Sequence, residues 1–163
     1  MADETNGAPK PEAPQPRLQI LTQYIRDVSF ENIAVQKGLV SEGKPEVRVG
    51  VNLDAQKRGD DRYEVALKVK VDSKLPEGPV FILELDYAGL FVVQNVPDEQ
   101  LHPLLMIECP RLIFPFARQI LADAIRNGGF PQLLLDPVDF ARLYQQRMQQ
   151  QAQAQAAAAG KPS

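Results

Sequence analysis

The sequence predicts an α+β fold in which a four-stranded antiparallel sheet precedes a helical region. Two observations carry this prediction. Apolar residues alternate with polar ones through the first two-thirds of the chain, and they recur at helical spacing in the last third. Clusters of Gly, Pro and Asp separate the alternating runs, as expected of turns. Such a sheet has one polar and one apolar face, and helices normally cover the apolar face.

Four alternating runs are expected to be strands. They span residues 24–31, 47–54, 63–72 and 80–94. In the first run Val28 and Phe30 share one face, because successive side chains of a strand point to opposite sides. Asp27 and Glu31 share the other face. In the fourth run, Gly89 is expected to mark a bend or a bulge.

The last third of the chain predicts helices. A short helix is expected over residues 98–107 and the main helix from Pro110 onward, with apolar residues at i, i+3, i+4 and i+7. Asn-Gly-Gly at 127–129 is a strong signal for its C-terminus. An extended apolar link, 130–135, should then lead to a last helix with Asp136 as its N-cap.

The 163 residues suit a single domain with tails at both ends. Residues 1–16 are rich in proline and poor in apolar side chains, which predicts a disordered tail. Residues 149–163 are a low-complexity Gln/Ala segment without an apolar stripe, and they are expected to form a flexible tail, helical where it leaves the domain. The structured domain is therefore expected over 17–148.

Composition argues against several classes of protein. The net charge is −3 and the 18 Lys and Arg residues are scattered, so nucleic acid is not an expected partner. The N-terminus lacks the basic and apolar regions of a secretory signal, and no run approaches the about 18 apolar residues of a membrane span. A single cysteine, Cys109, allows no internal disulfide. Together these features predict a cytoplasmic protein that does not insert into the membrane.

Catalytic machinery is not expected either. The one histidine, His102, has no partner set by a recognisable motif, and Cys109 fits a buried small side chain better than a nucleophile. One Cys and one His cannot make a structural zinc site, and no phosphate-binding loop occurs, so neither a metal nor a cofactor is expected. The carboxylates Asp27, Glu31, Glu84 and Asp86 predict either an ordinary solvated face or, if the first and fourth strands lie close in space, an acidic patch for a basic partner.

Four segments resemble the SecB family of protein-export chaperones. They are Tyr24–Glu31, Tyr87–Phe91, Glu108–Arg118 and Gly129–Phe140. The resemblance spans about residues 17–148 and implies a four-stranded sheet backed by a long helix and a C-terminal helix, assembled as a dimer of dimers. It also implies ATP-independent binding of unfolded precursor polypeptides, which are kept export-competent and delivered to the SecA motor ATPase.

The resemblance assigns roles to particular positions. Docking of the SecA motor is implied for Asp27, Glu31, Ile82 and Glu84. Assembly of the homotetramer is implied for Leu83, Leu85 and Tyr87. The client-binding groove is expected to include Phe30, Phe91, Leu112, Phe114, Leu133, Leu134 and Leu135.

Two alternatives remain at this point. The chain is either a general export chaperone or a SecB-like chaperone dedicated to one client, such as an antitoxin. An enzyme or a carrier of small ligands would need a polar constellation inside a pocket, and the sequence supplies no such motif. A general chaperone should bind many unfolded clients, a dedicated one should be selective, and a carrier should prefer a small apolar molecule.

Overall fold

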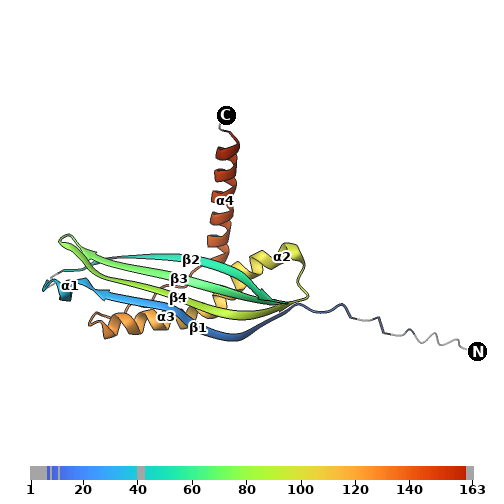
Figure 1. Ribbon diagram of the computed structural model, residues 1–163, viewed down its shortest axis with the longest axis horizontal. Helices are drawn as coiled ribbons and strands as arrows, with labels where there is room; N and C mark the ends of the chain where they lie inside the picture. Colours follow the sequence, from blue (N-terminus) through green and yellow to red (C-terminus); the bar gives the residue numbers. More distant parts are fainter. Residues whose placement is uncertain (1–6, 8, 11, 40–42, 161–163) are drawn as a thin grey trace, which may run out of the picture.

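The computed structural model describes residues 7, 9–10, 12–39 and 43–160, so part of each predicted tail lies outside the described residues. The described chain forms one curved sheet with its helices (Figure 1). The elements are β1 (Arg17–Asn32), α1 (Ile33–Gln36), β2 (Glu46–Gly59), β3 (Arg62–Leu75), β4 (Gly78–Gln94), α2 (Asp98–Pro103), the π-helix η1 (Leu104–Glu108), α3 (Cys109–Asn127) and α4 (Phe140–Ala159).

The predicted four-stranded antiparallel sheet is confirmed, with the strand order β1-β4-β3-β2. β1 begins at Arg17, well before the alternation in the sequence starts. The reason is that two register shifts interrupt it, one between Ile20 and Thr22 and one between Ile25 and Asp27. Each shift moves later side chains to the opposite face, and this hides the period of two. β1 and β2 are the two free edges of the sheet.

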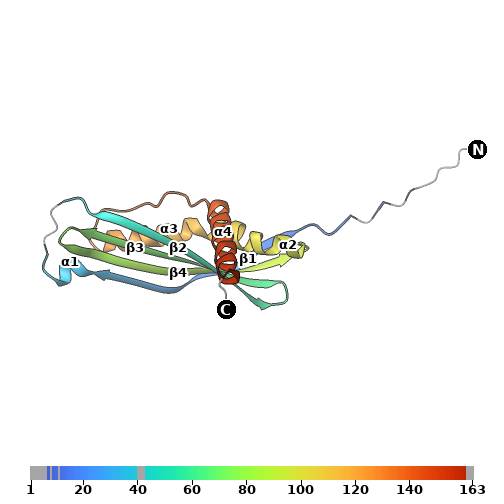
Figure 2. The same ribbon diagram turned by 90° about the horizontal axis from the view of Figure 1, so that it is seen from above.

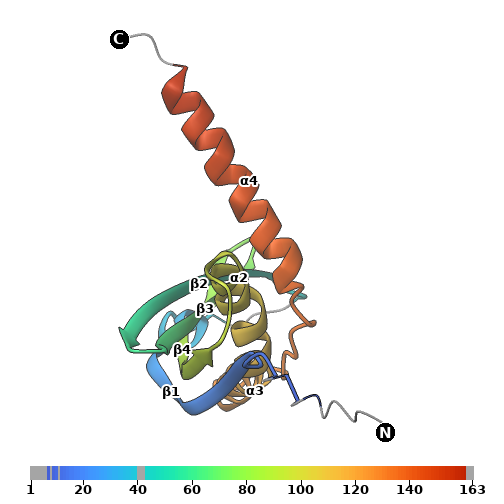
Figure 3. The same ribbon diagram turned by 90° about the vertical axis from the view of Figure 1, so that its right-hand side faces the viewer.

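α3 and η1 pack against one face of the sheet, and the core lies between them and the strands (Figures 2 and 3). On this face the pairs Val71–Leu83 and Val69–Leu85 stand opposite each other in the ladder between β3 and β4. All four side chains are at most 2% exposed. α3 packs its apolar stripe against these central strands, as the spacing of its apolar residues predicts. Within the described residues no helix packs on the opposite face of the sheet, which is called the open face below.

The helical region is more continuous than the sequence suggests. The short helix and the main helix are expected to be separate, but helical backbone runs unbroken from Asp98 to Asn127 through η1. η1 is a π-helix, a wider turn that is uncommon in proteins. It ends next to Pro110, which has no amide hydrogen to bond the carbonyl of the preceding turn.

The strand β4 does not form the expected bulge at Gly89. The ladders between β4 and its two neighbours show no register shift at Gly89, which pairs regularly with Gln23 and Val65. The need for glycine comes instead from packing, because a Cβ there would lie 2.8 Å from the Phe91 ring and 3.2 Å from Ile113. Phe91 is fully buried, so its ring has no room to move aside.

Gly89→Ala is therefore expected to destabilise the fold by about 1–3 kcal/mol, the usual cost of overpacking a core. Gly50→Ala is the matched control, because a Cβ at Gly50 meets nothing within 4 Å. The control should be neutral or slightly stabilising. Urea unfolding midpoints of the two variants measure the difference. Equal midpoints would show that the contacts at Gly89 do not constrain this position.

The last helix begins later than expected. Its N-cap is Asp139, whose side chain accepts a hydrogen bond from the amide of Arg142, and not Asp136. The extended link that the sequence predicts over 130–135 therefore continues to residue 139. α4 then points away from the sheet, as Figure 1 shows, and its residues from Gln149 to Ala159 are helical and exposed.

Candidate functional site

The structure brings the four predicted motor-docking residues together on the open face. Asp27 and Glu31 lie on β1, and Ile82 and Glu84 lie on the neighbouring strand β4. Glu31 pairs directly with Ile82 in the ladder. The three carboxylates are exposed and Ile82 is half-buried. An apolar side chain thus lies among three acidic ones on the open face.

Other charges on the open face shape this patch. Asp86, on β4, stands directly opposite Asp27 and adds a fourth carboxylate. On β3 the ammonium of Lys70 lies 3.8 Å from a carboxylate oxygen of Glu84 and 4.0 Å from one of Asp72. These pairs are exposed and hence weak. The carboxylates of the patch lie on β1 and β4, while Lys70 lies on β3. The negative charge of the open face is therefore greatest toward β1 and is partly balanced at β3.

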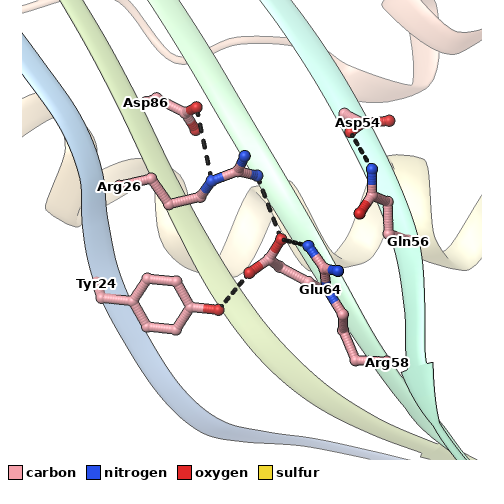
Figure 4. A network of polar contacts seen from close by, with 7 residues as sticks. All are labelled: Tyr24, Arg26, Asp54, Gln56, Arg58, Glu64 and Asp86. Carbon is pink, nitrogen blue, oxygen red and sulfur yellow. Dashed lines mark hydrogen bonds and ion pairs between the residues drawn. The ribbon is translucent and has the colours of Figure 1, made fainter.

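A buried carboxylate, Glu64, organises the same face further along the strands (Figure 4). It accepts hydrogen bonds from the Tyr24 hydroxyl at 2.6 Å, from Arg58 at 2.9 Å and from Arg26 at 3.2 Å. Arg26 also lies 3.7 Å from Asp86. The network therefore connects β1, β2, β3 and β4, and it engages the positive charge of Arg26 beside the acidic patch.

The hydrogen bonds from Tyr24 and then from Arg58 lower the pKa of Glu64, which keeps this carboxylate ionised. Burial, and then the hydrogen bond to Glu64, raise the pKa of Tyr24, so its hydroxyl remains a donor. Sequence reasoning missed this network. Glu64 is one more polar residue in an alternating run, and nothing local indicates that partners from two other strands converge on it.

An apolar groove lies at the other side of the molecule, between β2 and the link. The residues lining it are Val47, Val49, Leu133, Leu134, Leu135, Asp136 and Val138. Leu134 is 60% exposed, and Val47 and Val49 are each at least 40% exposed. Large apolar side chains left exposed side by side in this way usually mark a surface that binds another molecule. The predicted Leu133–Leu135 segment lies in the groove, whereas Val47 and Val49 were not predicted as client-binding residues.

The other four predicted groove residues lie elsewhere. Phe91 and Phe114 belong to the core, at 0% and 6% exposure, so the single chain leaves almost none of their surface open to a client. Phe30 is half-buried in an aromatic cluster with Phe81 and Phe130. Leu112 is exposed, but it lies on α3 and does not line the groove.

Leu83, Leu85 and Tyr87 lie in the core of the single chain. The resemblance implied that they form a subunit interface, yet they are 0%, 2% and 6% exposed within the single chain. Their side chains lie on the helix-covered face, inside the protomer's own core. Because the single chain already covers these side chains, they offer little area to a second subunit, and their role in assembly stays a prediction.

Exposed apolar side chains of another kind lie on β1 and α3. Leu21, Ile25 and Val28 on β1 are each more than 40% exposed, as are Leu112 and Phe116 on α3. Val28 pairs with Leu85 in the ladder, which places it on the same face of the sheet as the core but at the free edge. The sheet therefore ends in an apolar border that the described part of the chain leaves exposed.

His102 and Cys109, the residues considered for catalysis, both have contacts that hold the fold together. His102 contacts the Tyr144 hydroxyl through Nδ1 at 3.1 Å and so joins α2 to α4. Cys109 is fully buried. Burial, and secondarily the charge of Glu108, raise the pKa of its thiol to about 12. Among the residues that the structure describes, no group of three His, Cys, Asp or Glu side chains is placed to hold a metal ion.

Cys109 should therefore resist alkylation in the native protein. Iodoacetamide needs a thiolate, and burial disfavours both the thiolate and access to it. The raised pKa means that the folded state holds the proton more tightly than the unfolded state. The resulting stabilisation is complete below about pH 9 and is lost as the pH rises toward 12. Mass spectrometry should show an unmodified native chain and complete modification in urea. Rapid native labelling at neutral pH would contradict this assignment.

In the described part of the chain, no helix has the length and apolar character needed to cross a membrane.

Sequence comparison finds related proteins over almost the whole chain. The family model described as "Preprotein translocase subunit SecB" matches residues 11–151. The chain is 54% identical to the protein-export protein SecB of Dinoroseobacter shibae, with 97% of each chain covered. It is 53% identical to the proteins of the same name from Cereibacter sphaeroides and Paracoccus denitrificans, with 95% of this chain and 96% of each relative covered.

A solved structure has the same fold. It is a SecB-like chaperone of Mycobacterium tuberculosis in complex with a peptide from the HigA1 antitoxin. The TM-score is 0.61 at 13% identity, over 75% of this chain and 91% of that one. The family model, the near-complete coverage of the relatives and the shared fold all agree. The chain belongs to the SecB family of protein-export chaperones.

Proposed function

We propose that this chain is an ATP-independent cytoplasmic chaperone that holds unfolded precursor polypeptides and delivers them to the SecA motor. The observation that carries the proposal is the exposed groove of Val47, Val49 and the 133–135 leucines, in a chain of the SecB family. An unfolded chain exposes the apolar side chains that such a groove can cover. The groove lies on β2 and the link, away from the acidic patch on β1 and β4.

Docking of the motor is assigned to the acidic patch. Asp27, Glu31 and Glu84 are exposed around Ile82, so a partner with basic residues around an apolar one would complement the patch. The attraction acts mainly through exposed charges, so salt should weaken it. Because the groove and the patch lie on different strands, a client and the motor can be bound at the same time.

The homotetramer, a dimer of dimers, is assigned to the apolar border. Leu21, Ile25 and Val28 lie along the free edge of β1, and Leu112 and Phe116 form an exposed pair one turn apart on α3. Covering these side chains with other copies of the chain would remove apolar area from water. Leu112 is thus reassigned from the client groove to assembly.

The test of the proposed function mixes the purified protein with a denatured, slow-folding precursor in native buffer without nucleotide. Fluorescence follows refolding, and size-exclusion chromatography with light scattering follows the complex. Arrested refolding together with a stable complex is expected. Val49→Asp should reduce the arrest, because it places a charge in the apolar groove. Unimpeded refolding of several unrelated precursors would refute the general role and favour a chaperone dedicated to one client.

No catalytic activity is proposed. Cys109 is buried with a raised pKa, and His102 pairs with a tyrosine rather than with a nucleophile. The dedicated chaperone remains the second candidate function, since the neighbouring fold was solved with an antitoxin peptide. Relatives that are named protein-export proteins and are more than 50% identical favour the export role.

A further inference from the structure

The free edge of β2 changes character at Val51. Glu46–Gly50 are exposed throughout, whereas Val51 and Leu53 are half-buried. At this point Arg147 of α4 reaches the strand. Its Nη2 donates to the carbonyl of Val51 at 3.2 Å, and its Nη1 donates to the carbonyl of Leu53 at 3.4 Å. Nη2 also donates to the side-chain oxygen of Asn52 at 2.8 Å. One guanidinium thus binds the strand at three acceptors.

The odd-numbered residues of β2 direct their backbone groups to the free edge. Successive residues of an antiparallel strand point their N–H and C=O to opposite sides. The amide of Val93 donates to the carbonyl of Asp61 at 2.8 Å, so odd-numbered groups at this end of β3 face β4. The even-numbered backbone groups of β3 therefore face β2. Even-numbered residues of β3 pair with even-numbered residues of β2, so the even-numbered backbone groups of β2 face β3 and the odd-numbered ones face the free edge. The bonds of Arg147 to the Val51 and Leu53 carbonyls agree with this phase.

Val47 and Val49 therefore combine two properties. Their amide and carbonyl groups point to the free edge, and their side chains line the apolar groove together with the 133–135 leucines. An extended polypeptide laid along this edge would gain main-chain hydrogen bonds and also a groove for every second side chain. Beyond Gly50 the same edge is closed, because Arg147 already occupies the carbonyls that the added strand would need.

We propose that Arg147 is a stop, which confines strand pairing by an extended polypeptide to Glu46–Gly50 of β2. The inference rests on the proposed function and adds to it the mode and the limit of binding. The occupant is an extended segment with apolar side chains at alternate positions, because every second residue faces the groove. The guanidinium sets the register by ending the available edge. From α4, the Arg147 side chain reaches the strand at Val51–Leu53.

The first test uses a fluorescein-labelled synthetic peptide of alternating valine and serine residues and two N-methylated versions of it. N-methylation removes a main-chain donor and leaves the side chain in place. Methylation of the alternate residues that face β2 should weaken binding about tenfold, the loss of about two hydrogen bonds. Methylation of the intervening residues, whose N–H groups face solvent, should leave binding within about twofold.

The second test compares Arg147→Ala with Arg142→Ala, which removes the same charge from an exposed position on α4. Along the free edge of β2, binding of the peptide to the wild-type protein should slow hydrogen exchange of the Val47 and Val49 amides but not of the Val51 and Leu53 amides. In Arg147→Ala a peptide of twice the length should extend protection to Val51 and Leu53 and bind several-fold more tightly. The Arg142→Ala protein should behave as the wild type.

The outcomes separate the inference from the function on which it rests. If no peptide binds the wild-type protein, the proposed function fails. If both methylated peptides bind like the parent, the groove binds clients through side chains alone and strand pairing is refuted. If strand pairing is seen but Arg147→Ala leaves protection confined to Val47 and Val49, Arg147 is not the stop.

Discussion

Leu83→Asp is expected to abolish folding of the protomer. Leu83 is completely buried between Phe30 of β1 and Val71 of β3 in the ladder, beneath the helices. Aspartate at this position loses the packing of the leucine and buries a charge, and the buried polar residues among those described, Glu64 and Ser73, include no cation to neutralise it. The cost should be about 5 kcal/mol or more, similar to the whole stability of a small domain. Circular dichroism and thermal unfolding measure the loss.

Val28→Asp is the matched control for this prediction. Val28 also lies on the helix-covered face, but at the free edge of the sheet and 45% exposed. Its aspartate stays in contact with water, so the protomer should fold. Light scattering should then show a smaller assembly, because the apolar border carries the charge. If Leu83→Asp instead gave folded dimers and Val28→Asp remained tetrameric, Leu83 would belong to the interface after all.

The contrast between Leu83 and Val28 shows what the sequence can predict. The period of two correctly places both side chains on the apolar face, because alternation is a local property. Which apolar residues are covered depends on the strand order, and the order β1-β4-β3-β2 puts β4 inside and β1 at the edge. Sequence reasoning therefore predicted the face but could not separate core from border.

The client groove was only partly predictable for a related reason. Leu133, Leu134 and Leu135 stand out because three consecutive leucines in an extended link cannot all be buried. Val47 and Val49 look like any half-buried strand. Only the path of the link past the free edge of β2 brings the two segments together. Arg147 left no local signal at all, since its acceptors lie about ninety-five positions earlier in the chain.

The acidic patch was predicted best, because its members lie at alternate positions of two strands that prove to be neighbours. Asp27 and Glu31 on β1 and Glu84 on β4 fall on the open face in the expected phase. Their surroundings were less predictable. The approach of Lys70 to Glu84 and the engagement of Arg26 by Glu64 depend on β3, whose position next to β4 the sequence pattern leaves open.

Reversing two charges of the patch, with Asp27→Lys and Glu84→Lys in one chain, should weaken binding of the SecA motor by at least about tenfold at low salt. Both side chains are exposed, and neither has a close hydrogen-bond partner among the described residues except the weak 3.8 Å pair of Glu84 with Lys70. The fold should therefore persist. The loss follows from replacing attraction by repulsion toward a basic partner, and it should shrink as salt is raised.

The matched control reverses the same number of charges away from the patch, with Asp60→Lys in the β2–β3 turn and Glu99→Lys on α2, both exposed. Net charge changes equally, so a loss confined to the patch variant reports position rather than total charge. The refolding arrest of a denatured precursor should be unchanged in both proteins, because the groove of β2 and the link contains neither pair. If the patch variant lost motor binding and precursor holding together, the two surfaces would not be independent, and delivery would then require the client to leave as the motor docks.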